Sequence, residues 1–161
     1  MEGSLNKVVS YDNGFTVIAC WGLSPYSHDD DAARAVFAAQ NIQKKINRIG
    51  RSTFDTLSEL PIHIGVSTGS VFMGIIGNEG GRKEIVILGE AIERAFLLMQ
   101  TATRVYGKIF VDHETKVEAS LFIDFRYQEH VEFANKFTNH PIFEPLDSIT
   151  IYFKPIKSCK K

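Results

Sequence analysis

The sequence has little cysteine, almost no excess charge and no long apolar run. Its two cysteines, Cys20 and Cys159, lie in an apolar segment and in a Lys-rich tail. That placement fits neither a disulfide framework nor a zinc site, and it favours a reducing, intracellular setting. The 18 basic and 19 acidic side chains leave a formal net charge of -1. A general attraction to nucleic acid or to an anionic membrane is therefore excluded.

The apolar segments are too short to cross a membrane. The longest, 15–23 and 71–76, fall well below the roughly 20 residues that a spanning helix needs, and no charged leader precedes an apolar signal core. We therefore expect a cytoplasmic protein; a cytoskeletal or ciliary assembly stays open. With 161 residues, 44% of them hydrophobic, the chain has the length and the core for one domain, residues 1–161.

The first half of the chain alternates between strand and helix patterns. Two β-rich runs, 8–11 and 15–21, flank the turn sequence 12–14 (DNG), which predicts a hairpin. Apolar residues at helical spacing then predict a helix from Asp29 to about Gly50. Further along the chain we predict a second hairpin from 62–66 and 71–76, a turn between paired strands at 78–81, and a strand over 84–88.

The second half continues with shorter elements and no internal repeat. The pattern predicts a helix over 90–106, a strand over 108–111, a helix over 114–121, a half-buried strand over 122–133, a loop over 134–147, a last strand through Ile149, Ile151 and Phe153, and a basic tail at 156–161. This order predicts an α+β fold in which helices cover a mixed sheet.

Three ordered segments resemble one known family. Residues 63–77 (HIGVSTGSVFMGIIG) look like the Gly-rich hairpin of class III nucleotide cyclases, and 84–95 (EIVILGEAIERA) are similar to the strand, glycine and helix that follow it. Residues 6–9 with 15–22 resemble the preceding hairpin. The matches span 7–111 in the family's order, so the chain resembles a class III adenylate/guanylate cyclase catalytic domain, most closely the second (C2-type) wing of soluble adenylyl cyclases.

The resemblance implies a fold and a division of labour between two such wings. The family fold is a ferredoxin-like mixed sheet flanked by helices, and two wings pair head to tail around the nucleotide. One wing supplies two aspartates that hold divalent ions, and the other supplies a purine-reading Lys with an Asp or Thr, and a transition-state Asn and Arg. The first metal aspartate belongs to a strand that would precede Met1, so we expect an N-terminally truncated fold from a longer protein.

The family's metal and purine positions are mostly substituted. The second metal aspartate aligns with Phe15, and a phenyl ring offers none of the oxygen ligands that Mg²⁺ requires. Asp12 is nearby, but a role in the turn is favoured over a role at a metal. Lys7 aligns with the purine-reading lysine, although an ordinary lysine at a strand edge explains it equally well. Its expected companion aligns with Val86, which has no hydrogen-bonding group.

The transition-state positions are also altered. The Asn aligns with Glu93, whose carboxylate would repel a triphosphate, and the Arg aligns with Leu97, which has no charge. Arg94 is adjacent in sequence but about 100° further round the helix, so it contacts phosphate only if the register shifts. The alternative for Arg94 is a solvated helix face.

Other polar residues have simpler interpretations. The acidic start of a helix accounts for Asp29–Asp31 beside His28 better than a metal cluster does. His63 reads as a packed or edge histidine, and the Gly-rich residues 78–81 lack the Lys and Ser/Thr of a phosphate-binding loop.

These substitutions favour a degenerate wing that pairs with another cyclase-like wing, in the same protein or another chain, to complete, regulate or scaffold a cyclic-nucleotide-forming site. One alternative is a contributing subunit of an active adenylyl or guanylyl cyclase that converts ATP or GTP to cyclic nucleotide and pyrophosphate. Another is a purely structural scaffold in a larger assembly. We expect no cofactor to be held by this chain alone, and Mg²⁺ or Mn²⁺ only where a partner wing completes the site.

Overall fold

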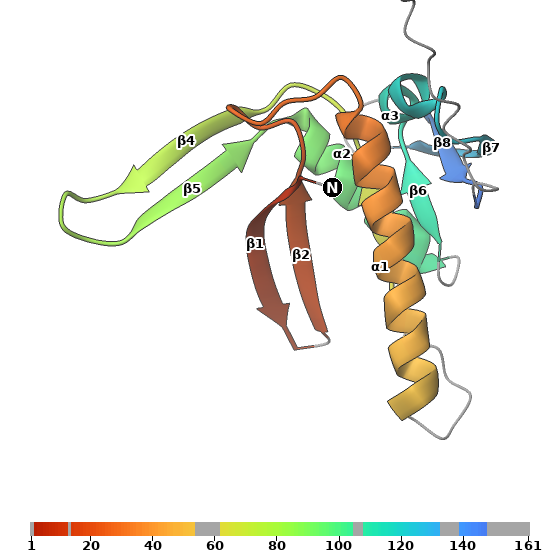
Figure 1. The fold of residues 1–161 in the computed structure, drawn as a ribbon, viewed down its shortest axis with the longest axis horizontal. Coiled ribbons are helices and arrows are strands. Elements are labelled where there is room, and N and C mark those ends of the chain that lie inside the picture. Colours follow the sequence, from red (N-terminus) through yellow and green to blue (C-terminus); the bar gives the residue numbers. More distant parts are fainter. Residues whose placement is uncertain (1, 13, 54–61, 105–107, 133–138, 148–161) are drawn as a thin grey trace, which may run out of the picture.

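A computed structural model describes residues 2–12, 14–53, 62–104, 108–132 and 139–147 (Figure 1). The elements in chain order are β1 (Ser4–Tyr11), β2 (Gly14–Cys20), α1 (Asp31–Thr53), β3 (Ile64–Val66), β4 (Phe72–Gly77), β5 (Lys83–Leu88), α2 (Glu90–Arg104), β6 (Ile109–Val111), α3 (His113–Ala119), β7 (Phe125–Glu132) and β8 (Asn139–Pro145). This is the predicted α+β architecture of a mixed sheet flanked by helices.

The first hairpin forms where the sequence predicts it. β1 and β2 pair antiparallel from Ser4 opposite Cys20 to Tyr11 opposite Gly14. Gly14 has a φ of +145°, a conformation that glycine adopts without the steric penalty of a side chain. The hairpin forms a two-stranded sheet of its own.

The acidic run before α1 belongs to the start of the helix, as predicted. α1 begins at Asp31, whose carboxylate accepts a 2.6 Å hydrogen bond from the backbone N–H of His28. One turn further along, the Arg34 guanidinium donates to Asp30 at 2.7 Å and holds the pKa of that carboxyl below its usual range. Negative charge at this end also complements the helix dipole.

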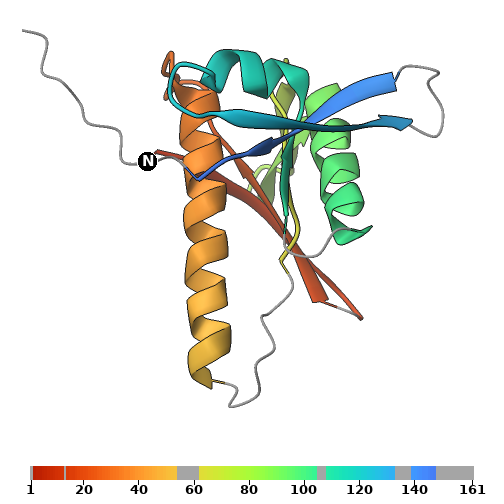
Figure 2. The same ribbon diagram turned by 90° about the vertical axis from the view of Figure 1, so that its right-hand side faces the viewer.

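The main sheet has four strands in the order β3-β6-β8-β7, with β3 parallel to β6 and the other pairs antiparallel. Helices lie on both of its faces (Figure 2). On one face, Val36 of α1 packs with Val111 and with Ala119 of α3. On the other, Leu98 and Ala102 of α2 pack with Phe110 and Ile142. The alternation of side chains along β6 therefore divides the core into two layers.

The second hairpin differs from the prediction. Segments 62–66 and 71–76 were expected to pair with each other, but β3 pairs with β6, and β4 pairs with β5 from Phe72 opposite Leu88 to Gly77 opposite Lys83. Gly65 gives a physical reason, because it lies directly against the backbone of α2 and holds β3 in the main sheet. Residues 78–81 are the turn between paired strands, as predicted. The β4–β5 ribbon projects away from the other strands (Figure 1).

The predicted loop over 134–147 is wrong over residues 139–145, which form β8, and residues 134–138 lie outside the described residues. Pro141 and Pro145 argued against a strand since proline cannot donate a ladder hydrogen bond. β8 accommodates both because it pairs with β6 only at Phe143, so the prolines lie where just one neighbour, β7, is paired. The strand predicted over 122–133 starts at Phe125. The last strand expected at 149–153 lies outside the described residues.

Replacement of Gly65 by alanine tests how closely β3 and α2 approach. A Cβ built on Gly65 would lie 2.6 Å from the Met99 backbone nitrogen and even closer to the Ala95 carbonyl oxygen. We expect Gly65→Ala to lower the free energy of unfolding by about 1–3 kcal/mol, as overpacking does, measured by urea denaturation. Gly81→Ala is the matched control, because its nearest neighbour would be 3.7 Å away. Equal midpoints for the two variants would contradict this packing.

Candidate functional site

The two residues expected to read a purine lie on neighbouring strands. The Asn6 side-chain amide donates to the Ile85 carbonyl at 3.3 Å, which places β1 beside β5. Lys7 extends to the same strand, where its ammonium lies 3.4 Å from the Glu84 carboxylate. Glu84 and Val86 are two residues apart on β5 and therefore share a face of the ribbon. The structure thus brings Lys7 close to the Val86 position.

The chemistry at that position is limited. Val86 lies opposite Gly74 in the ribbon, so neither member of the cross-strand pair offers a polar side chain. The nearest side-chain acceptor on the same face is the Glu84 carboxylate, and it already forms an ion pair with Lys7. Both members of that pair are about half exposed, so the lysine is held only weakly. Lys7 can turn toward a ligand. Val86 has no hydrogen-bonding group, so it cannot distinguish one purine base from another.

A cavity of about 470 Å³ opens beside these strands. Its wall is formed by the start of β1, the loop that follows β2, and the β4–β5 ribbon. Representative lining residues are Leu5, Tyr26, Met73 and Ile85. The cavity has mainly apolar walls with Lys83 and Glu84 at its margin, so it offers a stacking surface more than a set of polar contacts for a base.

The two residues that the resemblance aligns with transition-state donors lie on α2, the helix that follows Gly89. Glu93 is exposed and Leu97 is half-buried, and their spacing of four residues places them on one helix face. Neither side chain can donate a hydrogen bond to a phosphate oxygen at neutral pH. Arg94, one residue on from Glu93, points to a different part of the molecule.

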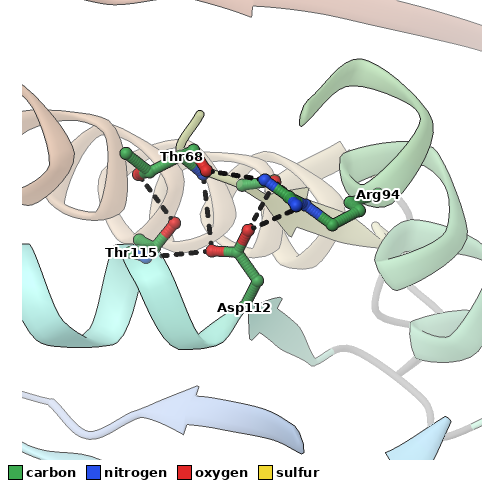
Figure 3. A network of polar contacts seen from close by, with 5 residues as sticks. Thr68, Arg94, Asp112 and Thr115 are labelled. Atoms are coloured by element: carbon green, nitrogen blue, oxygen red, sulfur yellow. Dashed lines mark hydrogen bonds and ion pairs between the residues drawn. The ribbon is translucent and has the colours of Figure 1, made fainter. Parts of the chain in front are cut away.

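Arg94 is bound within a polar network in the interior (Figure 3). Its Nη2 donates to the Thr68 carbonyl at 2.9 Å, and its Nε donates to the Ser67 hydroxyl at 3.2 Å. The same Nε lies 3.4 Å from a carboxylate oxygen of Asp112, and the Arg94 side chain is only 20% exposed. A Cβ on Gly69 would lie 2.7 Å from Nη2, so a glycine at that position leaves room for the guanidinium.

Asp112 is the centre of the network. Its carboxylate accepts from the Ser67 hydroxyl at 2.5 Å and from the Thr115 backbone N–H at 2.9 Å, and the second bond caps α3. Thr68 and Thr115 join through their hydroxyls at 2.9 Å. The network therefore connects the end of β3 with α2, the end of β6 and the start of α3.

Sequence reasoning did not identify Asp112. Its capping role could have been predicted from the local sequence. An acidic residue stands directly before a short helix, three residues ahead of Thr115, and this is the pattern of an N-cap. The role of Ser67 and Thr68 has no comparable local signal, because their partners are more than 25 residues away in the chain. Contact of Arg94 with phosphate stays a prediction; its Nε and one N–H of its Nη2 already donate within the protein.

The residues that the resemblance aligns with or near a metal position do not fit a divalent cation. Phe15 is the second residue of β2 and is 74% exposed, and Asp12 is an exposed residue of the hairpin turn. Within the part of the chain that the structure describes, no three His, Cys, Asp or Glu side chains are grouped as metal ligands. A single carboxylate in a turn cannot supply the several oxygen ligands that Mg²⁺ requires.

The remaining residues of interest have structural surroundings. His28 lies between Asp31, at 3.3 Å, and Glu2, at 3.0 Å. His63, just before β3, is half-buried, and its Nδ1 has no hydrogen-bond partner among the described residues. Cys20 is a free thiol whose pKa is raised by burial; Cys159 lies outside the described residues. None of the described helices is both long and apolar enough to span a membrane.

Comparison with solved structures identifies the fold. The adenylyl cyclase CyaB from P. aeruginosa aligns over 91% of this chain and 73% of its own, with a TM-score of 0.74 and 21% identity. The guanylate cyclase domain of RhGC from Catenaria anguillulae, solved with GTP, aligns over 86% and 71%, with a TM-score of 0.67 and 20% identity. The dimeric guanylyl cyclase domain of the RhoGC fusion protein from Blastocladiella emersonii aligns over 86% of this chain and 70% of its own, with a TM-score of 0.65 and 18% identity.

No protein-family model and no curated protein matches the sequence. The structural likeness therefore shows the fold: the described part of the chain has the fold of the solved adenylyl and guanylyl cyclase domains. This agrees with the fold that the three sequence segments implied.

The Arg94–Asp112 pair gives a stability prediction. Arg94→Ala would leave the Asp112 carboxylate buried without its cation, and such a loss is strongly destabilising. We expect the free energy of unfolding to fall by about 2–4 kcal/mol, measured by urea denaturation. The control is Glu93→Ala, which changes the exposed neighbour on the same helix. It should change the free energy of unfolding by less than about 0.5 kcal/mol. Equal effects of the two substitutions would show that the network contributes nothing.

Proposed function

We propose that residues 1–161 form a degenerate, C2-like wing of a class III nucleotide cyclase region. In this proposal the wing pairs with another cyclase-like wing, in the same protein or in a second chain, and completes, regulates or scaffolds a cyclic-nucleotide-forming site. The observation that carries the proposal is the cyclase fold; the sequence resemblance adds the alignment of Glu93 and Leu97 with the family's transition-state donors.

The electrostatics of α2 support this degeneracy. Cyclisation needs positive charge or hydrogen-bond donors around the phosphates as negative charge develops. Glu93 brings a negative charge instead, and the guanidinium of Arg94 is shared among Asp112, Ser67 and the Thr68 carbonyl. Loss of one donor typically slows such reactions by about 10²- to 10³-fold. A wing with these substitutions depends on its partner for the chemistry.

The apolar surface of the β4–β5 ribbon supports pairing. One face presents Phe72 beside Leu88, with Ile76 nearer the tip, and all three side chains are mostly exposed. Ile75, on the opposite face, is 70% exposed. Burial of each large apolar side chain stabilises a contact by about 1.5–3 kcal/mol. A projecting ribbon with several such residues is typical of a protein interface.

Lys7 favours a second candidate, a contributing subunit of an active cyclase. It is exposed on β1 next to the apolar cavity, and its ion pair with Glu84 is weak enough for a nucleotide to displace. In this case the partner wing supplies the metal ligands, Mg²⁺ or Mn²⁺ is held there, and Lys7 contacts the purine of ATP or GTP. A scaffold without any nucleotide is the third candidate, and a cytoplasmic location suits all three.

An activity assay separates these candidates. We expect the purified chain alone, incubated with ATP or GTP and with Mg²⁺ or Mn²⁺, to form no cyclic nucleotide above the uncatalysed background, because its described residues offer no group of metal ligands. Product formation by the chain alone, abolished by Lys7→Ala, would overturn the degenerate assignment. With a partner wing that carries both metal aspartates, a loss on Lys7→Ala but not on Lys45→Ala, an exposed lysine of α1, would favour the contributing subunit.

Pairing through the ribbon is tested by placing charge on it. Phe72→Asp or Ile75→Asp should weaken association with a second cyclase wing, or with a second copy of the chain, by at least about tenfold, since each carboxylate would have to be desolvated. Sedimentation velocity measures the change. Leu121→Asp is the control, because Leu121 is 88% exposed in the turn after α3. Unchanged hydrodynamic size for both ribbon variants would count against this interface.

A further inference from the structure

His28 lies between two carboxylates, one at each nitrogen of its ring. Its Nε2 is 3.0 Å from a carboxylate oxygen of Glu2, and its Nδ1 is 3.3 Å from a carboxylate oxygen of Asp31. A neutral imidazole has one N–H donor and one acceptor nitrogen, whereas an imidazolium has two donors. Both contacts can therefore be hydrogen bonds only while His28 is charged.

The two carboxylates are held to different degrees. The Asp31 side chain is 14% exposed, and its other oxygen accepts from the His28 backbone N–H at 2.6 Å. The Glu2 side chain is 66% exposed, and among the described residues it has no hydrogen-bond or ion-pair partner other than His28. When His28 loses a proton, its remaining N–H can stay with Asp31, and the Nε2 lone pair then faces Glu2. Glu2 is therefore the carboxylate that is released.

The surrounding charges do not substitute for the lost proton. The charged residues next to or near His28 are Glu2, Asp29, Asp30, Asp31 and Arg34. Arg34 is the one basic member of this group, and its guanidinium is paired with Asp30 at 2.7 Å. When His28 becomes neutral, the carboxylates of the group have a single cation among them, so their mutual repulsion grows.

The Glu2–His28 contact joins two parts of the wall of the apolar cavity. Residues 4–6, at the start of β1, form one part, and residues 23–26, in the loop after β2, form another. Glu2 stands two positions before the first of these segments, and His28 stands two positions after the second. The contact therefore holds the start of β1 against the loop.

Trp21 indicates whether this segment is in place. It directly follows β2 and is the only tryptophan of the chain. Gly3, next to Glu2, lies against its ring, because a Cβ there would be 2.6 Å from the indole Nε1. That nitrogen is buried and has no hydrogen-bond partner in the described part of the chain. Water reaches the indole when residues 2–3 move away.

We propose that the Glu2–His28 contact is a pH-sensitive switch. At about pH 5.5, histidine is mostly protonated while carboxylates are still ionised, so the contact forms. As the pH rises to about 8, His28 loses its charge, Glu2 turns to solvent, and residues 2–3 leave Trp21. The loop stays attached to α1 through the His28 backbone N–H, so the change is confined to the start of β1 and its part of the cavity wall. This switch does not depend on the proposed cyclase function.

The fluorescence of Trp21 in the full chain measures the switch. Between about pH 5.5 and pH 8, at constant ionic strength, we expect the emission to move to longer wavelength and acrylamide quenching to increase. The ratio of released to closed molecules should rise by about two- to fivefold, the range for a partly exposed ion pair. Emission and quenching that do not change with pH would overturn the proposal.

Two substitutions distinguish the switch from a general effect of pH. In Glu2→Gln, the new amide can accept from a charged His28 and donate to a neutral one, so Trp21 should stay protected at both pH values. In His28→Gln, the pH dependence should disappear because no group at that position titrates. The matched control is His113→Gln, at an exposed histidine of α3, and it should respond like the unchanged chain.

The variants also show which results contradict the switch. A pH response that persists in His28→Gln, or one that is lost in His113→Gln, would assign the change to another group and overturn the proposal. An exposed Trp21 in Glu2→Gln at both pH values would overturn it too, because the amide would then form neither of the two hydrogen bonds. Cyclic-nucleotide formation and dimerisation do not enter these measurements.

Discussion

The ion pair between Arg94 and Asp112 is the interaction on which the arrangement of the wing depends. Asp112 lies at the junction of β6 and α3, and Arg94 extends from α2 on the other face of the sheet to reach it. Ser67 and Thr68 add the end of β3 to the same network. Four elements from separate parts of the chain thus converge on one mostly buried carboxylate. Such a pair stabilises the fold only while both charges and their hydrogen bonds are present.

In the degenerate wing that we propose, this interaction would let the fold keep its form without the chemistry. The Arg94 guanidinium is positioned by the Asp112 carboxylate, the Ser67 hydroxyl and the Thr68 carbonyl, and these contacts hold it within the network. Selection for stability and selection for catalysis would act on different residues of α2, with Arg94 serving the first. Replacement of the expected donors by Glu93 and Leu97 then leaves the helix packing intact, because Glu93 is exposed and Leu97 is only half-buried.

Local patterns in the sequence predicted most of the elements but not all of the pairing. The first hairpin and α1 follow from a turn signal and from helical periodicity, both of which are contained in adjacent residues. The partners of β3 and β8 were missed since they depend on contacts between distant segments. In the local sequence, Gly65 indicates only an interruption of a strand. In the fold, the missing side chain lets α2 approach β3 closely. Pro141 and Pro145 argue against a strand unless the single-sided pairing of β8 is known.

The positions of the candidate site come from the resemblance, and only the structure gives their surroundings. The resemblance identified Lys7, Val86, Glu93 and Leu97, and the structure places the first two on adjacent strands and the last two on one helix face. The ion pair between Lys7 and Glu84 could not be predicted from the sequence, because the two residues are 77 positions apart and their strands meet only in the fold. The same is true of the network that binds Arg94.

The exposed β4–β5 ribbon has a consequence for the lifetime of the protein. A two-stranded ribbon by itself is only marginally stable in water, and this one exposes large apolar side chains on both faces, Phe72 on one and Ile75 on the other. While these side chains are uncovered, they are available to any other hydrophobic surface, copies of the same chain included. Anything that covers the ribbon soon after synthesis would therefore protect the chain from aggregation and from chaperone-directed degradation.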